Sequence, residues 1–134
     1  MKAEKAELIA LRMAGAQKTF HEVEEYLVEN QLWNTAVNRL YYACFYAVLA
    51  LLHNYELETK THSGALHVFG LHFIKTGFID KKHHKFFTTL FEMRQGADYE
   101  AGVEYDREDV LPLLPQAKEL IDCIITVLEM SGNE

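Results

Sequence analysis

Apolar residues recur at helical spacing through almost the whole chain of 134 residues. Between residues 4 and 29, apolar or small positions advance by three or four, which is the repeat of one face of a helix. Four glutamates lie opposite or beside this face. We therefore expect a first helix over about residues 4–29, with this face turned toward the core. The face consists of Leu8, Leu11, Gly15, Thr19, Val23 and Tyr26.

The next helix is expected to begin near Gln31 or Leu32, and it is apolar on nearly every side. Its longest uninterrupted apolar run, residues 43–52, is about half the length of a membrane span, so we expect no transmembrane helix. A helix that is apolar all round belongs at the centre of a bundle. The three apolar faces are Trp33, Val37, Leu40, Cys44, Ala47 and Leu51; Tyr41, Phe45, Val48 and Leu52; and Tyr42, Tyr46 and Leu49.

Three further helices follow, and no segment shows the alternation of a strand. The first covers about residues 61–76 and stops at Gly77, and the second is capped by Asp80. The last helix carries Pro112 and Pro115 in its opening turns, where proline is tolerated. The sequence thus predicts one all-α domain over residues 1–134: an antiparallel up-and-down four-helix bundle with a fifth short or additional helix.

The composition is that of a soluble globular protein, with 49% hydrophobic and 25% charged residues. The two cysteines, Cys44 and Cys123, have no CxxC partner, which excludes a disulfide framework and indicates a reducing compartment. The N-terminus mixes acids with bases and lacks an apolar core, so we expect no signal peptide. These features predict a cytoplasmic protein without a membrane partner.

The net charge of −7 argues against strong non-specific binding to nucleic acid. The charge is uneven, however: residues 1–59 carry −3, residues 60–97 carry +4, and residues 98–134 carry −8. The basic middle segment is either a local basic face or an ordinary solvated helix surface, and the sequence leaves both open.

Polar residues occur where the periodicity predicts core. Asn38 and Arg39 lie one turn before apolar aromatic positions, and Arg94 continues the stripe that includes Leu90. A buried amide or guanidinium without partners costs about 1–3 kcal/mol or more, so each should be paired. The candidate partner of Arg94 is Asp98, one turn further on. The pairing is either a polar plug within the core, completed by tyrosine hydroxyls, or part of a ligand site.

The histidines do not form a metal-binding pattern. His62, His67 and His72 are spaced by five, which rotates successive side chains by about 140° on a helix. They therefore cannot converge as a zinc-binding pair does. The sequence also has no P-loop, GxGxxG or GxSxG motif, and we expect neither a metal nor a cofactor.

Three segments in register resemble the HEPN domain family, and together with their spacing they cover about residues 4–130. The first resembles the signature helix of the family, the second the step that opens its third helix, and the third its arginine followed by aspartate and tyrosine. The segments are residues 34–47 (NTAVNRLYYACFYA), 61–64 (THSG) and 94–99 (RQGADY).

The resemblance implies a helical bundle that commonly forms a homodimer and acts beside a minimal nucleotidyltransferase in a prokaryotic toxin–antitoxin module. Many relatives are metal-independent ribonucleases that use an arginine and, after four to six intervening residues, a histidine. Arg94 is the counterpart of that arginine, but positions 99–101 are Tyr99, Glu100 and Ala101. The chain therefore resembles the group that lacks the catalytic histidine, because a tyrosine with a pKa near 10 is a poor base at neutral pH.

These features lead to three functional hypotheses, and they leave open whether the protein is an enzyme. The first is a catalytically weak or inactive module that binds nucleotide or RNA. The second is a ribonuclease with a substituted site, in which Tyr99 or His62 replaces the missing histidine beside Arg94. The third is a purely structural or interaction bundle. The candidate ligand- or phosphate-binding residues are Arg94, Asp98, Tyr99, Asn38, Arg39 and Tyr42.

The number of aromatic residues predicts a homodimer. More aromatic area is present than one small core is expected to need, and a monomer rarely exposes a large apolar patch. We expect the dimer to use part of the fourth helix, with Arg94 near the shared groove and Asp98 or an anion between the two arginines. The aromatic residues are Trp33, Tyr41, Tyr42, Phe45, Tyr46, Phe86, Phe87 and Phe91.

Overall fold

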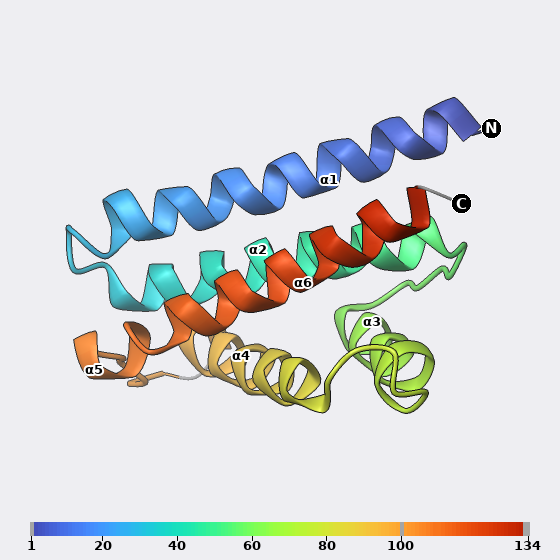
Figure 1. Ribbon diagram of the computed structural model, residues 1–134. Coiled ribbons are helices and arrows are strands. Elements are labelled where there is room, and N and C mark those ends of the chain that lie inside the picture. Colours follow the sequence, from blue (N-terminus) through green and yellow to red (C-terminus); the bar gives the residue numbers. More distant parts are fainter. Residues whose placement is uncertain (1, 100, 133–134) are drawn as a thin grey trace.

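The computed structural model describes residues 2–99 and 101–132, and over these residues it is helical without any strand (Figure 1). The all-α prediction is confirmed. The elements are α1 (Lys2–Glu22), the π-helical turn η1 (Val23–Leu27), α2 (Trp33–Asn54), α3 (His62–Phe69), the π-helical turn η2 (Gly70–Ile74), α4 (Lys81–Tyr99), α5 (Arg107–Val110) and α6 (Leu113–Gly132).

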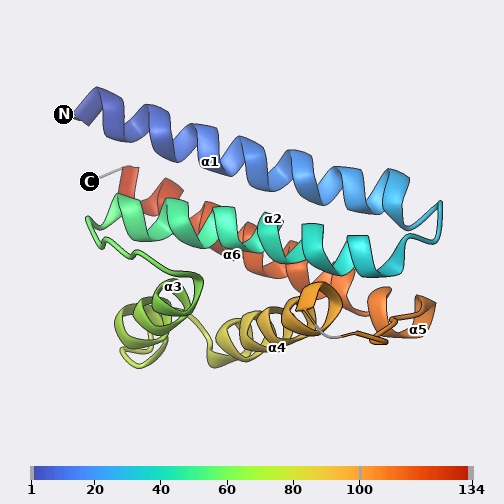
Figure 2. The same cartoon turned by 180° about the vertical axis from the view of Figure 1, so that it is seen from behind.

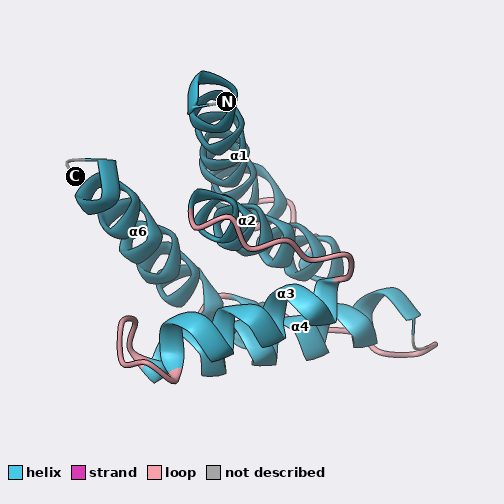
Figure 3. Cartoon of the chain, turned by 90° about the vertical axis from the view of Figure 1, so that its right-hand side faces the viewer, coloured by secondary structure: helices cyan, strands magenta, loops and turns pink. Residues whose placement is uncertain are grey.

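Four long helices, α1, α2, α4 and α6, alternate in direction and form the bundle (Figure 1). The short helix α3 lies between α2 and α4 in the chain, and α5 lies between α4 and α6. Figure 2 shows the connection after α2 running back to α3, which packs beside the first part of α4. Viewed along the bundle in Figure 3, α1 and α2 form a close pair, and α6 stands apart from α1.

The central helix is α2, as the sequence predicts. It packs against α1, α4 and α6, and half of its residues are buried. In length and apolar composition α2 would also suffice to cross a membrane, but 61% of its apolar window is buried by the other helices. Its apolar surface is therefore used inside the bundle.

Local sequence signals fix the helix ends. Thr61 caps α3 by accepting a hydrogen bond from Gly64 N at Oγ1 (2.9 Å), and Asp80 Oδ1 accepts one from Lys82 N (2.8 Å) at the start of α4. Gly77 has φ +80°, a conformation that favours glycine, just beyond η2. As expected, the two prolines flank the start of α6.

The inner face of α1 differs from the prediction. Thr19 and Val23 of the expected face are buried, but Leu11 and Tyr26 are 70% and 62% exposed. Met13 and Ala16, which lie outside that face, are buried instead. Leu11 is two residues from Met13 and therefore points about 200° away from it around the helix. Because α1 is covered mainly by α2, only a narrow stripe is buried, and η1 widens the helix and changes the register before Tyr26.

The eight aromatic side chains from which a dimer is predicted are buried or half-buried within a single chain. Tyr41, Phe86 and Phe87 are buried, and the other five aromatic residues of that set are half-buried against the core. The expectation that one core has no room for these side chains was wrong for the first three. The homodimer itself stays a prediction.

Candidate functional site

Arg94 lies on the inner side of α4, where the sequence places it. It continues the buried stripe of Phe87 and Leu90, and only 7% of the residue is exposed. This stripe faces α2, the helix that carries the polar positions Asn38 and Arg39. The polar residues that interrupt the apolar pattern, Asn38 and Arg39 on α2 and Arg94 on α4, therefore lie on two helices that pack against each other.

The guanidinium of Arg94 is held by three hydrogen bonds. Nε donates to Asp98 Oδ2 at 3.1 Å, and Nη2 donates to the hydroxyls of Tyr42 and Tyr99 at 3.0 and 3.2 Å. Asn38 Nδ2 donates to the same Asp98 oxygen at 2.8 Å, so one carboxylate receives a donor from each helix. Asp98 is thus positioned from α2 while it neutralises the arginine on its own helix.

Aromatic rings surround the same guanidinium. Its carbon Cζ lies 5.4 Å from the ring centroid of Tyr41, 5.3 Å from that of Tyr42 and 5.4 Å from that of Tyr99. These distances are within the range of cation–π attraction, which is stronger in a partly desolvated place. Arg39 contacts these residues only through Tyr42, whose ring centroid lies 5.6 Å from the Arg39 Cζ.

His62 reaches this cluster from the start of α3. Its Nδ1 lies 3.0 Å from the hydroxyl of Tyr41, and its ring stacks on Phe45 with centroids 4.3 Å apart. Burial, and then the positive charge of Arg94, lower the pKa of His62 below its usual 6.5. The imidazole is therefore neutral at pH 7, and it is connected to Arg94 through Tyr41.

One end of the Arg94 guanidinium has no hydrogen-bond partner in the part of the chain that the structure describes. Nη1 makes no hydrogen bond to any residue that the structure describes, whereas Nε and Nη2 are both bonded. Tyr99, which lies against the guanidinium, is 67% exposed. Nη1 can therefore donate a hydrogen bond to a further acceptor, such as a phosphate oxygen, next to the exposed ring of Tyr99.

The described residues offer little support for a metal site or for a cysteine nucleophile. No group of three His, Cys, Asp or Glu side chains in residues 2–99 and 101–132 could hold a metal ion. Burial raises the pKa of the Cys44 thiol, so this cysteine is a packing residue and not a nucleophile at neutral pH.

The structure brings together most of the residues predicted from sequence and adds two others. Arg94, Asp98, Tyr99, Asn38 and Tyr42 form one hydrogen-bonded network, His62 adjoins it, and Arg39 lies at its edge. The additional members are Tyr41 and Phe45, which the periodicity identified only as core positions. A tyrosine on a buried face signals a hydroxyl that needs a partner, and this signal could have identified Tyr41.

Asn34 stabilises the backbone beyond the network. Its amide nitrogen donates to Val103 O at 2.9 Å, and its Oδ1 accepts from Tyr105 N at 2.8 Å. Tyr105 in turn donates from its hydroxyl to Met93 O at 2.9 Å. These contacts tie the connection after α4 to the first turn of α2, close to the Arg94 network.

Comparison with known proteins agrees with this arrangement of motifs. The model of the HEPN domain family matches residues 11–128. A UPF0332 protein from Thermotoga maritima is 40% identical over 103 residues, which cover 77% of this chain and 78% of that protein.

Two proteins of Methanocaldococcus jannaschii that carry the name putative toxin are also similar. One is 39% identical over 93 residues, which cover 69% of this chain and 63% of that protein. The other is 33% identical over 103 residues, which cover 77% of this chain and 76% of that protein. With the family model matching most of the chain, this protein belongs to the HEPN domain family.

Proposed function

We propose that this protein is the HEPN component of a toxin–antitoxin-like module, and that its Arg94 cluster binds a phosphate of RNA or of a nucleotide. The names of the two Methanocaldococcus jannaschii relatives support the first part. The observation that carries the second part is the Nη1 of a buried arginine, which has no hydrogen-bond partner among the described residues, while Nε and Nη2 are held by Asp98, Tyr42 and Tyr99.

The module is non-catalytic or only weakly catalytic in this proposal, and it acts in the cytoplasm as a homodimer beside a minimal nucleotidyltransferase. Tyr99 occupies the position where ribonucleases of the family carry a histidine. Its hydroxyl accepts a hydrogen bond from Arg94, and a phenol lacks the proton-accepting ring nitrogen that a histidine offers. Asp98 already neutralises Arg94, so phosphate binding depends on directed hydrogen bonds more than on net charge.

The test compares the affinity of wild type and Arg94→Lys for fluorescent single-stranded RNA by anisotropy. Lysine keeps the positive charge but lacks the planar guanidinium, so we expect a dissociation constant about tenfold larger for the variant. Arg107→Lys is the matched control, because Arg107 is exposed on α5. Equal affinities, or no binding by wild type at about 100 µM protein, the weak end of non-specific binding, would refute the phosphate site.

A second candidate function, a ribonuclease with a substituted base, is favoured by one observation. His62 is neutral at pH 7, and its contact with Tyr41 places it beside the Arg94 cluster. In the tautomer with the proton on Nδ1, which donates to Tyr41, Nε2 could accept a proton from a ribose hydroxyl. Labelled RNA is incubated with wild type, Arg94→Lys and His62→Gln. Loss of cleavage in both variants supports this function, and equal cleavage by all three proteins identifies a contaminating nuclease and ends the hypothesis.

The partner is tested separately. The tagged protein is co-expressed with a minimal nucleotidyltransferase from the same genome, and the mixture is separated by size exclusion. Co-elution at a fixed ratio is the expected result. Separate elution of two folded proteins would remove the nucleotidyltransferase from the proposal while leaving the RNA-binding test unaffected.

A further inference from the structure

A groove lies at the surface where α3 and η2 pack beside the first half of α4. Its volume is about 480 Å³. Leu66, Leu71 and Ile74 supply the apolar lining from α3 and η2, and His84 and Thr88 line it from α4. The groove therefore runs between two helical segments, and most of its lining is aliphatic.

Gly70 interrupts the ridge of side chains along one wall of this groove. Leu66, Gly70 and Ile74 follow one another at steps of four residues, so they lie along one side of the α3–η2 segment. The ring of His84 fills the space beside Gly70: a Cβ there would lie 2.8 Å from Nε2 of His84, and this nitrogen lies 3.2 Å from Leu66 O. The ridge thus has a gap that one large apolar side chain of a partner helix can fill.

The apolar lining is accessible to a partner. Leu71 is 44% exposed, and Leu66 and Ile74 are half-buried. A groove of this kind is where the apolar face of an amphipathic helix packs. Residues 63–74, which include the lining from α3 and η2, extend over about 16 Å at 1.5 Å per residue. This length matches about three turns of a partner helix.

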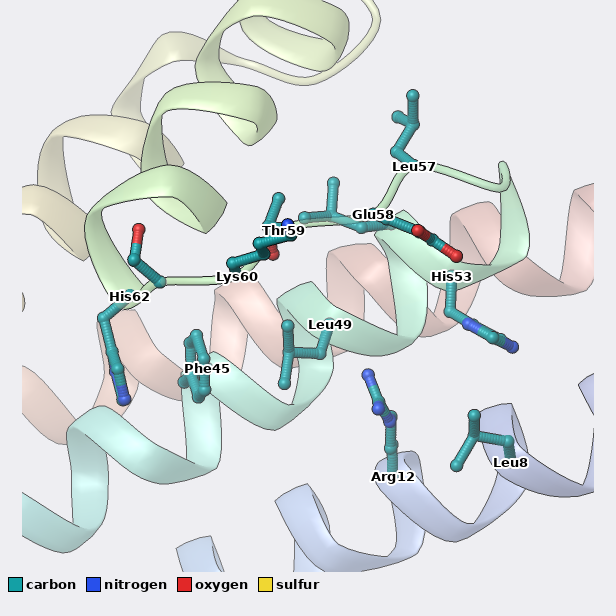
Figure 4. Close-up of a pocket in the computed structure, with 12 residues that line it drawn as sticks. Leu8, Arg12, Phe45, Leu49, His53, Leu57, Glu58, Thr59, Lys60 and His62 are labelled. Atoms are coloured by element: carbon teal, nitrogen blue, oxygen red, sulfur yellow. The ribbon is translucent and has the colours of Figure 1, made fainter.

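The lining contains basic groups and, among the described residues, no carboxylate. The basic groups are Lys75, His67 and His84. The pocket between α1, α2 and the α2–α3 connection differs in this respect, because its lining includes Glu58 together with Arg12 (Figure 4). The groove beside α4 therefore has charged groups of one sign, and it favours an anionic partner.

Two further lysines flank the groove on α4. Lys81 precedes His84 by three residues, and Lys85 precedes Thr88 by three, so each lies one turn from a lining residue. Neither of them, nor Lys75, forms an ion pair with any residue in the part of the chain that the structure describes. Three exposed ammonium groups are thus available to carboxylates of a partner.

The nearby acids do not neutralise these lysines. Within residues 60–97, which carry a net charge of +4, the carboxylates are those of Asp80 and Glu92. Asp80 Oδ1 accepts a hydrogen bond from Lys82 N at the start of α4, and Glu92 lies one turn beyond Thr88, outside the lining. Glu119 of α6 pairs with Lys82. The positive charge beside the groove is therefore not balanced by these three acids.

We propose that this groove binds an amphipathic helix of a partner protein, with apolar residues on one face and carboxylates beside that face. One large apolar side chain inserts over Gly70 between Leu66 and Ile74, and the carboxylates pair with Lys75 and Lys85. A single-stranded nucleic acid fits the groove less well, because the described lining has no Phe, Tyr or Trp ring on which a base could stack.

The experiment titrates the intact protein into a fluorescent synthetic peptide of about 15 residues, or four helical turns, with leucines on one face and glutamates beside them. One control peptide replaces every glutamate by lysine, and a second replaces every leucine by serine. We expect the acidic amphipathic peptide to bind and each control to bind at least about tenfold more weakly. In NMR spectra, the largest shifts should occur at the backbone amides of Gly70 and Leu71.

The variants Leu71→Ser and Lys75→Glu test the groove. Each is expected to weaken binding of the acidic peptide by about tenfold, because one loses apolar contact area and the other reverses a charge. Leu11→Ser and Lys18→Glu on α1 are the matched controls, since both residues are exposed, and they should leave the affinity unchanged. Circular dichroism melting verifies that all four variants remain folded.

Several outcomes would overturn the proposal. They are no binding of the acidic peptide at about 1 mM, equal binding of this peptide and either control peptide, or unchanged affinity in either groove variant. Self-association of wild type that Leu71→Ser abolishes would assign the groove to a second copy of the chain instead. Binding of single-stranded RNA that Lys75→Glu weakens and the acidic peptide displaces would assign it to nucleic acid.

The proposal does not rest on phosphate binding at Arg94. Arg94 lies in the second half of α4 and does not belong to the lining of the groove. Loss of RNA binding in Arg94→Lys, with peptide binding retained, therefore concerns only the proposed function. Loss of peptide binding in Leu71→Ser, with RNA binding retained, supports the groove as a separate interaction surface.

Discussion

The hydroxyl of Tyr41 and Nδ1 of His62 lie 3.0 Å apart, and this contact joins the Arg94 network to the pocket lined by Arg12. Tyr41 also places its ring 5.4 Å from the Arg94 guanidinium. Burial raises the pKa of Tyr41, so the hydroxyl keeps its proton and is available to donate to His62. One buried tyrosine therefore orients the imidazole and covers the arginine.

The first prediction concerns this hydrogen bond. Tyr41→Phe removes the hydroxyl and keeps the ring, so the free energy of unfolding should fall by about 1 kcal/mol. In wild type, nitrogen NMR should find the proton of neutral His62 on Nε2, and this preference should weaken in the variant. Tyr46→Phe on the same helix is the control and should change neither quantity. The Nδ1–H tautomer in wild type would contradict the assignment of the donor.

The second prediction concerns the partly buried ion pair of Arg94 and Asp98. Arg94→Met should lower the free energy of unfolding by about 2–4 kcal/mol, because Asp98 keeps only the donor from Asn38 and two tyrosine hydroxyls lose the donor that Arg94 supplies. Asp98→Asn should cost less, since the Asp98 side chain is 24% exposed. In a double-mutant cycle by urea denaturation, the coupling should be about 1 kcal/mol. A coupling near zero would show that the pair makes no net contribution.

The third prediction is a loss of stability in mild acid. The pKa values of both His62 and His83 are below the usual 6.5, in each case mainly because of burial. Below pH 6.5 the unfolded chain therefore binds more protons at these positions than the folded chain, and protons favour unfolding. The melting temperature should fall between about pH 7 and pH 5, above the range in which carboxylates titrate.

A double variant provides the control for this pH dependence. His62→Gln with His83→Gln removes both imidazoles, so its melting temperature should depend less on pH over the same interval. A variant with the same slope as wild type would place the pH dependence in other groups.

The fourth prediction compares two glycines. A Cβ at Gly70 would lie 2.8 Å from Nε2 of His84, whose ring nitrogen contacts Leu66 O at 3.2 Å, so Gly70→Ala should be destabilising. Apart from its chain neighbours and the nearby backbone of its own helix, no atom of the described residues lies within 4 Å of a Cβ at Gly132, the last residue of α6, and Gly132→Ala should be neutral or stabilising by up to about 1 kcal/mol. Thermal melts that rank the two variants in the opposite order would contradict the packing of η2 against α4.

The fifth prediction is the homodimer, with part of α4 at the interface and Arg94 near the shared groove. Its support now comes from Tyr99, which is 67% exposed at the end of α4, and no longer from an unburied aromatic surplus. Light scattering should report about twice the 15.5 kDa of one chain. A mass near 15.5 kDa for wild type would refute the dimer. The variant Tyr99→Ala should have a measured mass closer to that of one chain than wild type has.

The sequence alone determined the helical class, the central position of α2 and the polar residues that require partners. These follow from local rules: apolar spacing predicts a helix and its buried side, and a polar residue on that side must be compensated. Arg94 and Asp98 are one turn apart on a single helix, so their proximity needed no knowledge of the fold.

Only the tertiary structure decided which helices supply the other partners. Tyr42 and Asn38 meet Arg94 and Asp98 because α2 packs against α4, and His62 reaches Tyr41 because α3 folds back toward α2. The exposure of Leu11 likewise depends on how much of α1 its neighbours cover. Periodicity specifies the angle of a side chain around its own helix, but the partner across an interface depends on the packing of whole helices, which no local pattern contains.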